Sequence, residues 1–147
     1  MSTILVVDDA PDIRLLLRAV LQRSGHHLVD AESGSVALAL LDDGLVPDVV
    51  ILDIQMPGLD GWETLTRMRA HEVAVDVPVL MLSVKASPQD MSRAWQLGCD
   101  GYLTKPFDIG DLAREVQAIA AMTPTERSAV RRVRLAAALD QSREMSV

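Results

Sequence analysis

The chain has 147 residues, 49% of them apolar, which suffices for one compact domain with a sizeable core but not for two ordinary domains. Its formal net charge of −7 disfavours nucleic acid as a partner of the main body, because phosphate backbones attract Lys and Arg. The sequence has no apolar run of membrane-spanning length, no signal-peptide pattern at its N-terminus, and a single cysteine, Cys99, which excludes an internal disulfide. We therefore expect a cytoplasmic protein that binds no membrane.

Short β-branched runs alternate with longer segments of helical period through the first 122 residues. This alternation predicts an α/β fold of the (βα)5 type, a doubly wound five-stranded parallel sheet with helices on both faces. The expected strands are Thr3–Val7, His27–Ala31, Val49–Leu52, Val79–Leu82 and Gly101–Thr104. The expected helices are Pro11–Ser24, Ser35–Asp42, Trp62–Ala70, Pro88–Leu97 and Ile109–Met122.

The last 25 residues differ in character, and we expect a boundary between a domain at 1–122 and a C-terminal extension at 123–147. The extension holds five basic and three acidic residues, against nine and eighteen before it. Thr123, Pro124 and Glu126 form the pattern of a capped helix start, which predicts a sixth helix through about Leu139. The segment is too short for an independent DNA-binding fold. We expect a helix that docks on the body or on a partner, or that leads to an effector.

Polar residues stand where four of the predicted strands end. In a doubly wound sheet, ligands gather at the carboxyl ends of the strands, so these side chains are expected to converge. Each alone also fits an ordinary role as a helix cap, a turn residue or a solvated strand end. The converging residues are Asp8 and Asp9 after the first strand, Asp53 after the third, Ser83 after the fourth and Lys105 after the fifth.

Three carboxylates held together repel one another unless a cation lies among them. Oxygen ligands favour a hard divalent ion, Mg²⁺ or Mn²⁺, and the chain has no His or Cys spacing for zinc at this edge. We expect Asp8, Asp9 and Asp53 as ligands, together with the backbone carbonyl of Gln55. Asp53 is then a candidate nucleophile that forms an acyl phosphate, with Ser83 and Lys105 contacting the phosphoryl oxygens.

The motifs VVDD, LDIQMPGLDG, LS and GYLTKPF resemble, in order and spacing, those of bacterial two-component response-regulator receiver domains of the CheY-like kind, over about residues 3 to 121. The resemblance implies a signalling phosphoacceptor rather than an enzyme with a separate substrate. It would receive a phosphoryl group from a histidine kinase or a phosphotransfer protein. The implied roles are acceptor for Asp53, Mg²⁺ ligands for Asp8 and Asp9, phosphoryl contact for Lys105, switch for Ser83 and Tyr102, a cis peptide bond between Lys105 and Pro106, and dephosphorylation tuning for Gln55 and Lys85.

The same resemblance places the output surface on the fourth helix, the fifth strand and the fifth helix. Met91 and Trp95 are four residues apart and share a helix face beside the strand that carries Tyr102. An exposed Trp95 would anchor a downstream protein or a second copy of the chain. The alternative is that Trp95 folds over neighbouring apolar surface. Trp62 is expected to pack in the core.

Three other functions fit parts of the pattern. An aspartate-nucleophile phosphatase of the haloacid-dehalogenase type needs a second aspartate two residues after the nucleophile, where this chain has Gln55. A flavin-binding flavodoxin-like module needs a loop that cradles phosphate after the first strand, and the acids Asp8 and Asp9 would repel it. A degenerate receiver that works as an interaction module without phosphorylation is the third, and the full set of Asp, Ser and Lys argues against it.

Overall fold

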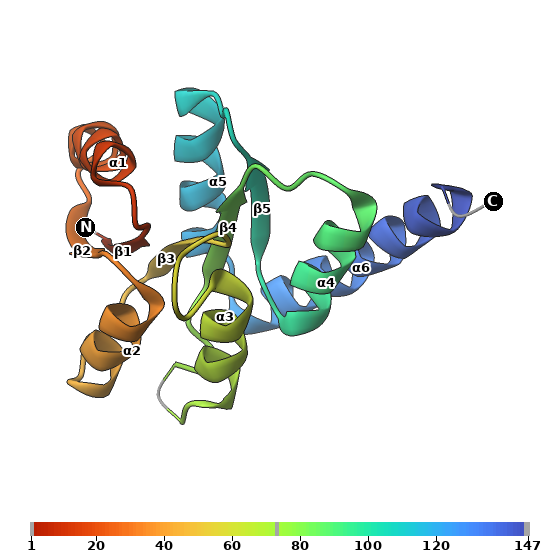
Figure 1. Ribbon diagram of the computed structural model, residues 1–147, viewed down its shortest axis with the longest axis horizontal. Helices are drawn as coiled ribbons and strands as arrows, with labels where there is room; N and C mark the ends of the chain where they lie inside the picture. The colour runs from red at the N-terminus through yellow and green to blue at the C-terminus, as the bar shows by residue number, and fades with distance from the viewer. Residues whose placement is uncertain (1, 73, 146–147) are drawn as a thin grey trace.

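The computed structural model describes residues 2–72 and 74–145, over which strands and helices alternate along the chain (Figure 1). Five strand–helix pairs form the predicted (βα)5 arrangement, and a sixth helix follows them. The strands are β1 Thr3–Val7, β2 His27–Ala31, β3 Val49–Asp53, β4 Val79–Ser83 and β5 Gly101–Thr104. The helices are α1 Pro11–Arg23, α2 Gly34–Asp42, α3 Gly61–Ala70, α4 Pro88–Leu97, α5 Ile109–Ala121 and α6 Pro124–Met145.

The five strands form one parallel sheet in the order β2-β1-β3-β4-β5. Strand β1 lies between β2 and β3, so that Val7 pairs with Ala31 on one side and Leu52 on the other. The chain reverses its direction of winding at this point, which is where a doubly wound sheet opens a crevice at the carboxyl ends of its strands. Asp8, which follows β1, and Asp53, which ends β3, lie at the carboxyl ends of these two neighbouring strands.

Helices cover both faces of the sheet, α1 and α5 on one and α2, α3 and α4 on the other (Figure 1). The inward residues of β1 alternate accordingly: Ile4 and Val6 pack with α1 and α5, whereas Leu5 and Val7 pack with the other helices. All residues of β3 and β4 are buried. Burying a side chain the size of Leu or Ile contributes about 2 kcal/mol. The resulting core holds the carboxyl ends of the central strands in fixed register.

Side-chain and glycine caps mark the ends of several helices, including the predicted start of α6. The Ser87 side chain accepts a hydrogen bond from the Asp90 N–H at the start of α4, and Gly98 ends that helix in the left-handed conformation at φ 98°. Thr123 and Glu126 form a capping box, in which each side chain accepts the other residue's backbone N–H. Ser33, for which the sequence indicated no role, caps α2.

The expected bounds need small corrections at several ends and a larger one at α6. Strands β3 and β4 extend one residue further, to Asp53 and Ser83, because each last residue still pairs with the neighbouring strand. Helix α6 continues to Met145 rather than ending near Leu139. Residues 140–145 contain no Gly or Pro, and the Asp140 and Arg143 side chains lie 3.8 Å apart along the added turn.

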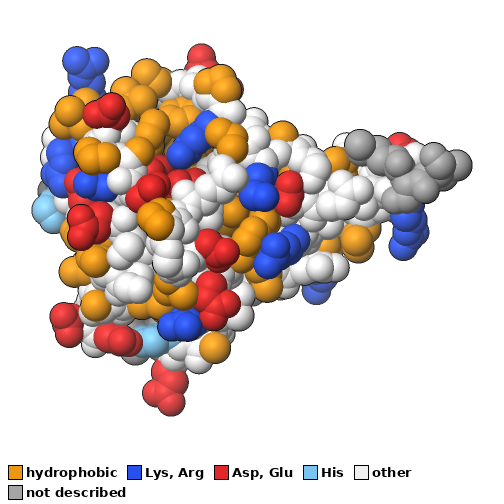
Figure 2. Space-filling model, in the orientation of Figure 1, with side chains coloured by type: hydrophobic (Ala, Val, Ile, Leu, Met, Phe, Trp, Pro, Cys, Tyr) orange, Lys and Arg blue, Asp and Glu red, His pale blue; other side chains and the backbone are white. Residues whose placement is uncertain are grey.

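Helix α6 packs along α4, beyond strand β5, and its C-terminal end extends away from the body (Figure 1). The space-filling view shows this end as an arm that carries basic side chains (Figure 2). Ala138 of α6 is buried against the core cluster that contains Trp95. Among the described residues, no helix is long and apolar enough to cross a bilayer.

Candidate phosphoacceptor site

The carboxyl ends of four strands bring the predicted polar residues to one edge of the sheet. Asp8 follows β1, Asp53 ends β3, Ser83 ends β4 and Lys105 follows β5. The Lys105 Nζ lies 3.0 Å from Asp8 Oδ2 and 3.6 Å from Asp53 Oδ1, so residues 97 and 52 positions apart in the sequence share one ion-pair cluster. The Lys105–Pro106 peptide bond, which the resemblance implied to be cis, is cis.

Asp8, Asp9 and Asp53 each offer a carboxylate oxygen, and these oxygens lie within 4.8 Å of one another. Asp8 and Asp53 are buried, whereas Asp9 lies at the exposed rim. A single ammonium group, that of Lys105, contacts the buried pair. Three carboxylates with one nearby lysine leave an excess of negative charge that a divalent cation would neutralise. The cluster is compatible with a divalent metal site made only of oxygen ligands.

The surroundings of Asp53 shift the pKa of its carboxyl group upward. Burial, and after it the neighbouring charge of Asp8, raise the pKa of Asp53 to about 6. The Lys105 ammonium and a hydrogen bond from the Gln55 N–H to Asp53 Oδ1, at 3.3 Å, act in the opposite direction. Asp53 is therefore mostly ionised at neutral pH, but its carboxylate is destabilised compared with one in water, which favours binding of a cation.

Backbone contacts fix the acids in place. Asp8 Oδ1 accepts the Ala10 N–H at 2.9 Å, and Arg14 Nη1 donates to the Asp8 backbone carbonyl at 2.6 Å. Gly61 lies against the backbone of Asp53 so closely that any Cβ there would clash with the Asp53 carbonyl oxygen. Neither Arg14 nor Gly61 was predicted as a site residue. The signal for Gly61 was the Asp60-Gly61 pair at the end of the motif LDIQMPGLDG.

Ser83, Lys85 and Tyr102 form a connected group beside the acids. Ser83 is fully buried, and its Oγ accepts the Lys85 N–H at 3.1 Å. The Tyr102 hydroxyl donates to the Lys85 carbonyl at 2.6 Å. Burial raises the pKa of Tyr102 to about 12, opposed by a hydrogen bond with the Ser83 side chain. The two residues with a predicted switch role thus meet at the backbone of Lys85.

The two predicted tuning residues share a hollow next to the acceptor. Gln55 and Lys85 line it, together with Trp62 and Arg93, and its volume is about 510 Å³. The Arg93 guanidinium lies 4.4 Å from the centre of the Trp62 ring, a cation–π contact. Trp62 itself is buried, as expected for a packing residue.

The expected output residues are close together; Trp95 is buried, whereas Met91 and Tyr102 are half-buried. Trp95 is 9% exposed and belongs to the core, which corrects the expectation of an exposed anchor and supports the alternative that it folds over apolar surface. Met91, Trp95 and Tyr102 line a crevice whose other wall is α6. The sixth helix therefore covers the part of the predicted output surface that α4 and β5 form.

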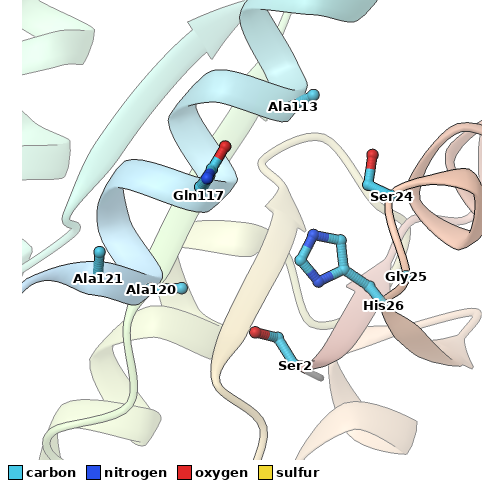
Figure 3. A pocket seen from close by; sticks show the side chains of 8 residues that line it. All are labelled: Ser2, Ser24, Gly25, His26, Ala113, Gln117, Ala120 and Ala121. Carbon is cyan, nitrogen blue, oxygen red and sulfur yellow. The ribbon is translucent and has the colours of Figure 1, made fainter.

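A second hollow, of about 440 Å³, lies at the opposite end of the sheet (Figure 3). Figure 3 shows Gln117 and Ala113 of α5 on one side and His26, Ser24 and Ser2 on the other. These residues belong to α5 and to the segments that precede β1 and β2, so the hollow is remote from the carboxyl edge where the acids lie.

The sequence profile of the response regulator receiver domain matches residues 4–117 of the chain. The chain belongs to the response regulator receiver family. This membership confirms the resemblance seen in the motifs, and the (βα)5 sheet with its additional C-terminal helix is the fold expected of a CheY-like receiver domain. Response regulators are signalling proteins of two-component systems. The parts of the chain outside the profile are its first three residues and the segment from 118 onward, which includes all of α6.

The chain is similar to parts of two longer transcriptional regulators. It is 34% identical over 122 residues to the phosphate regulon transcriptional regulatory protein PhoB of Pseudomonas aeruginosa, covering 83% of this chain and 53% of PhoB. It is 37% identical to the DNA-binding dual master transcriptional regulator RpaA of Synechocystis, covering 84% of this chain and 51% of RpaA. The chain thus spans about half the length of these relatives.

Solved structures agree with the fold. The chemotaxis protein CheY4 of Vibrio cholerae superposes with a TM-score of 0.76 at 32% identity, covering 81% of this chain and 98% of CheY4. A putative response regulator from Chloroflexus aurantiacus gives a TM-score of 0.77 at 33% identity, covering 82% of this chain and 98% of that protein. Both matches cover nearly all of the solved chain, so the receiver fold of this protein agrees with theirs from end to end.

Proposed function

We propose that this receiver domain accepts a phosphoryl group on Asp53 from the phosphohistidine of a histidine kinase or a phosphotransfer protein. One carboxylate oxygen of Asp53 attacks phosphorus, and the bond between phosphorus and the donor imidazole nitrogen breaks. The imidazole leaves with the bonding electrons and Asp53 becomes an aspartyl phosphate. The observation that carries the proposal is the position of Asp53, a buried carboxylate between Asp8 and the Lys105 ammonium at the carboxyl edge of the sheet.

The surrounding side chains supply what phosphoryl transfer requires, which is positioning and neutralisation of charge. Lys105 is near enough to Asp53 to pair with a phosphoryl oxygen. The Ser83 Oγ accepts the Lys85 N–H, and its O–H, which lies beside the Tyr102 hydroxyl, can turn to donate to another phosphoryl oxygen. A divalent cation, Mg²⁺ or Mn²⁺, held by Asp8, Asp9, Asp53 and the Gln55 carbonyl, would neutralise the negative charge of the site.

The lifetime of the aspartyl phosphate would depend on how water reaches it. Hydrolysis transfers the phosphoryl group to water and restores the Asp53 carboxylate. Gln55 and Lys85 border the hollow beside the acceptor, so their side chains would govern the approach of an attacking water. We infer that these two residues tune dephosphorylation.

The signal would leave the site through Ser83 and Tyr102 to the surface formed by α4, β5 and α5. The two hydroxyls already contact the same residue, Lys85, through its N–H and its carbonyl. The partner would be a downstream protein or a second copy of the chain. Residues 1–122 would act as the receiver and 123–147 as an extension without DNA-binding activity of its own, although PhoB and RpaA are described as transcriptional regulators.

The test is phosphorylation of the full chain by acetyl phosphate with Mg²⁺, followed by intact mass measurement. We expect one added phosphoryl group that survives acid and is lost in alkali. Asp53→Asn should abolish the label. The matched control is Asp12→Asn, which removes an exposed acid from the first turn of α1 and should leave the label unchanged. An unmodified wild type, or an Asp53→Asn variant that still accepts phosphate, would contradict the proposal and favour a receiver that acts without phosphorylation.

A further inference from the structure

Helix α6 lies over the surface through which a receiver of this design would pass its signal. We name the residues Met91, Trp95 and Tyr102 the covered surface. They line a crevice of about 260 Å³ with Arg134, Ala137, Ala138 and Gln141 of α6. A second crevice, of about 220 Å³, runs between Trp95, Tyr102 and the α6 residues Val130 and Arg134. The chain's own C-terminal helix therefore occupies the place that a partner would take.

The first turns of α6 are anchored around the buried Asp100 by Arg127, which is buried, and Arg131, which is half-buried. The Arg127 guanidinium is 7% exposed and donates to the carbonyls of Met122 and Asp76, each at 2.9 Å. Arg131 Nε lies 3.4 Å from Asp100 Oδ1, and Arg127 Nε lies 3.7 Å from the same oxygen. Asp100 is buried in the turn before β5. Separating charges that are paired and buried in this way is strongly unfavourable, so the start of α6 is expected to stay in place.

The second half of α6 is held much more weakly. Among its apolar side chains, Ala138 is buried and Leu135 and Leu139 are partly buried, and the polar Ser142 is partly buried as well. Alanine buries little apolar area, so its contact contributes much less than a leucine would. Val133 and Ala136 face away from α4 and are exposed. Segments with few buried apolar contacts are the first to open in a native protein, which marks the half of α6 after Arg134 as the labile one.

A short path of contacts joins the phosphoacceptor site to this labile half. Ser83 Oγ accepts the Lys85 N–H, and the Lys85 carbonyl accepts the Tyr102 hydroxyl. The Tyr102 side chain in turn lines both crevices beneath α6. A shift of Ser83 toward a phosphoryl group would move the Lys85 backbone, and with it the hydrogen bond that holds the Tyr102 ring.

We propose that the second half of α6 is a phosphorylation-controlled cover, hinged on the Arg127–Arg131–Asp100 anchor, that closes the covered surface in the unphosphorylated protein. The inference rests on the proposed phosphorylation of Asp53. When Tyr102 moves, the contacts of Leu135 and Ala138 weaken and the second half of α6 detaches, while its first two turns stay bound. Met91, Trp95 and Tyr102 then become accessible to a partner.

The test is amide hydrogen exchange of the full chain, read by mass spectrometry with and without phosphate on Asp53. We expect exchange of the amides after Arg134 to be about tenfold faster in the phosphorylated protein, with exchange at Arg127–Arg131 unchanged. The phosphorylated fraction is measured in the same sample. Phosphate on Asp53 with no change in α6 exchange would overturn this inference alone, whereas failure to phosphorylate would overturn the proposed function.

A matched pair of variants tests the cover without phosphorylation. Ala138→Glu places a charge against the core and should give the fast exchange of the second half of α6 in unphosphorylated protein. Ala136→Glu makes the same change on the exposed side of the same helix and should leave exchange as in the wild type. Equal exchange in the two variants would overturn the inference, because α6 would then not depend on its contact with α4.

Discussion

Two clusters of charged side chains, each with a buried aspartate, lie at opposite edges of the same sheet. One has an excess of negative charge and the other an excess of positive charge. At the carboxyl edge, Asp8, Asp9 and Asp53 share one lysine, so negative charge is in excess. At the amino edge, Asp100 alone lies among the guanidiniums of three arginines. Here the excess positive charge is met by backbone carbonyls, those of Gly98 and Val77 among them. The arginines are Arg69, Arg127 and Arg131.

The two clusters therefore differ in character. The carboxyl-edge cluster has the features of a functional site, whereas the amino-edge cluster connects elements of the fold. Each arginine of the amino-edge cluster donates to a backbone carbonyl, which offsets part of the cost of burial, while Asp100 Oδ1 and Arg131 Nε face each other as an ion pair without a hydrogen bond. Burial lowers the pKa of Arg69, opposed by the charge of Asp100. The acids of the carboxyl edge lack comparable compensation, and the pKa of Asp53 is raised to about 6. Such a perturbed carboxylate is typical of a functional site.

The largest expected effect comes from breaking the amino-edge cluster. Asp100→Asn removes the carboxylate that three arginines share, and we expect it to lower the free energy of unfolding by about 3 kcal/mol or more. Urea unfolding at pH 7 measures the loss. The control is Asp140→Asn on the exposed part of α6, which should change stability by less than about 0.5 kcal/mol. Equal effects of the two substitutions would show that the cluster does not hold the fold together.

The same change at the carboxyl edge should have the opposite sign. Asp53→Asn removes an unfavourably buried charge, so we expect the metal-free protein to gain roughly 1 to 2 kcal/mol at pH 7. Because the folded pKa of Asp53, about 6, lies above the usual aspartate value of 3.8, the wild type loses stability as the pH rises from about 4 to 6. The gain of the variant should therefore be full above pH 6 and vanish below about pH 4. Urea unfolding of both proteins at several pH values between about 4 and 7 measures the difference in their free energies of unfolding. A difference that does not change with pH would show that the pKa of Asp53 is not raised.

Adding a divalent cation should reverse the cost at the carboxyl edge. Mg²⁺ at tenfold its dissociation constant would stabilise the wild type by about 1.4 kcal/mol at pH 7.5. The effect should weaken below pH 6, because protons compete for Asp53. Asp9→Asn removes the exposed ligand and should reduce the shift in melting temperature. A shift that is the same in this variant and in the wild type would place the ion elsewhere.

The smallest expected effect compares two neighbouring arginines of α6. Arg131→Gln takes one cation away from Asp100 and from the Gly98 carbonyl, and should cost about 1 kcal/mol. Arg132→Gln changes an exposed residue and should be neutral within about 0.5 kcal/mol. Thermal unfolding of the two variants gives the comparison directly. If Arg132→Gln is the more damaging of the two, the anchor of α6 is wrongly placed.

The carboxyl-edge site was predictable because its geometry follows from local sequence. Parallel strands in a doubly wound sheet end at one edge, so the residues after each strand must converge, and Asp8, Asp53 and Lys105 do. The amino-edge cluster had no such signal. Arg69 and Asp100 are 31 residues apart on different elements, and the arginines of α6 carry no mark that distinguishes the buried Arg127 from the exposed Arg132.

The same limit applies to the covered surface. Met91 and Trp95 were predicted to share a helix face, but periodicity in α4 cannot indicate that a later helix lies over that face. Nor does the sequence determine the side-chain conformation that brings the Tyr102 hydroxyl to the Lys85 carbonyl. Contacts between elements distant in the chain depend on how the packed elements meet, whereas strand ends and caps depend on neighbours in sequence.

The most direct test of the central claim is chemical mapping of the phosphorylated residue. Borohydride reduces an aspartyl phosphate to homoserine, which peptide sequencing by mass spectrometry locates. After phosphorylation of the full chain with Mg²⁺, we predict homoserine at position 53 and unmodified aspartate at positions 8 and 9. Homoserine at either of those positions, or at none of the three, would contradict the assignment of Asp53 as the phosphoacceptor.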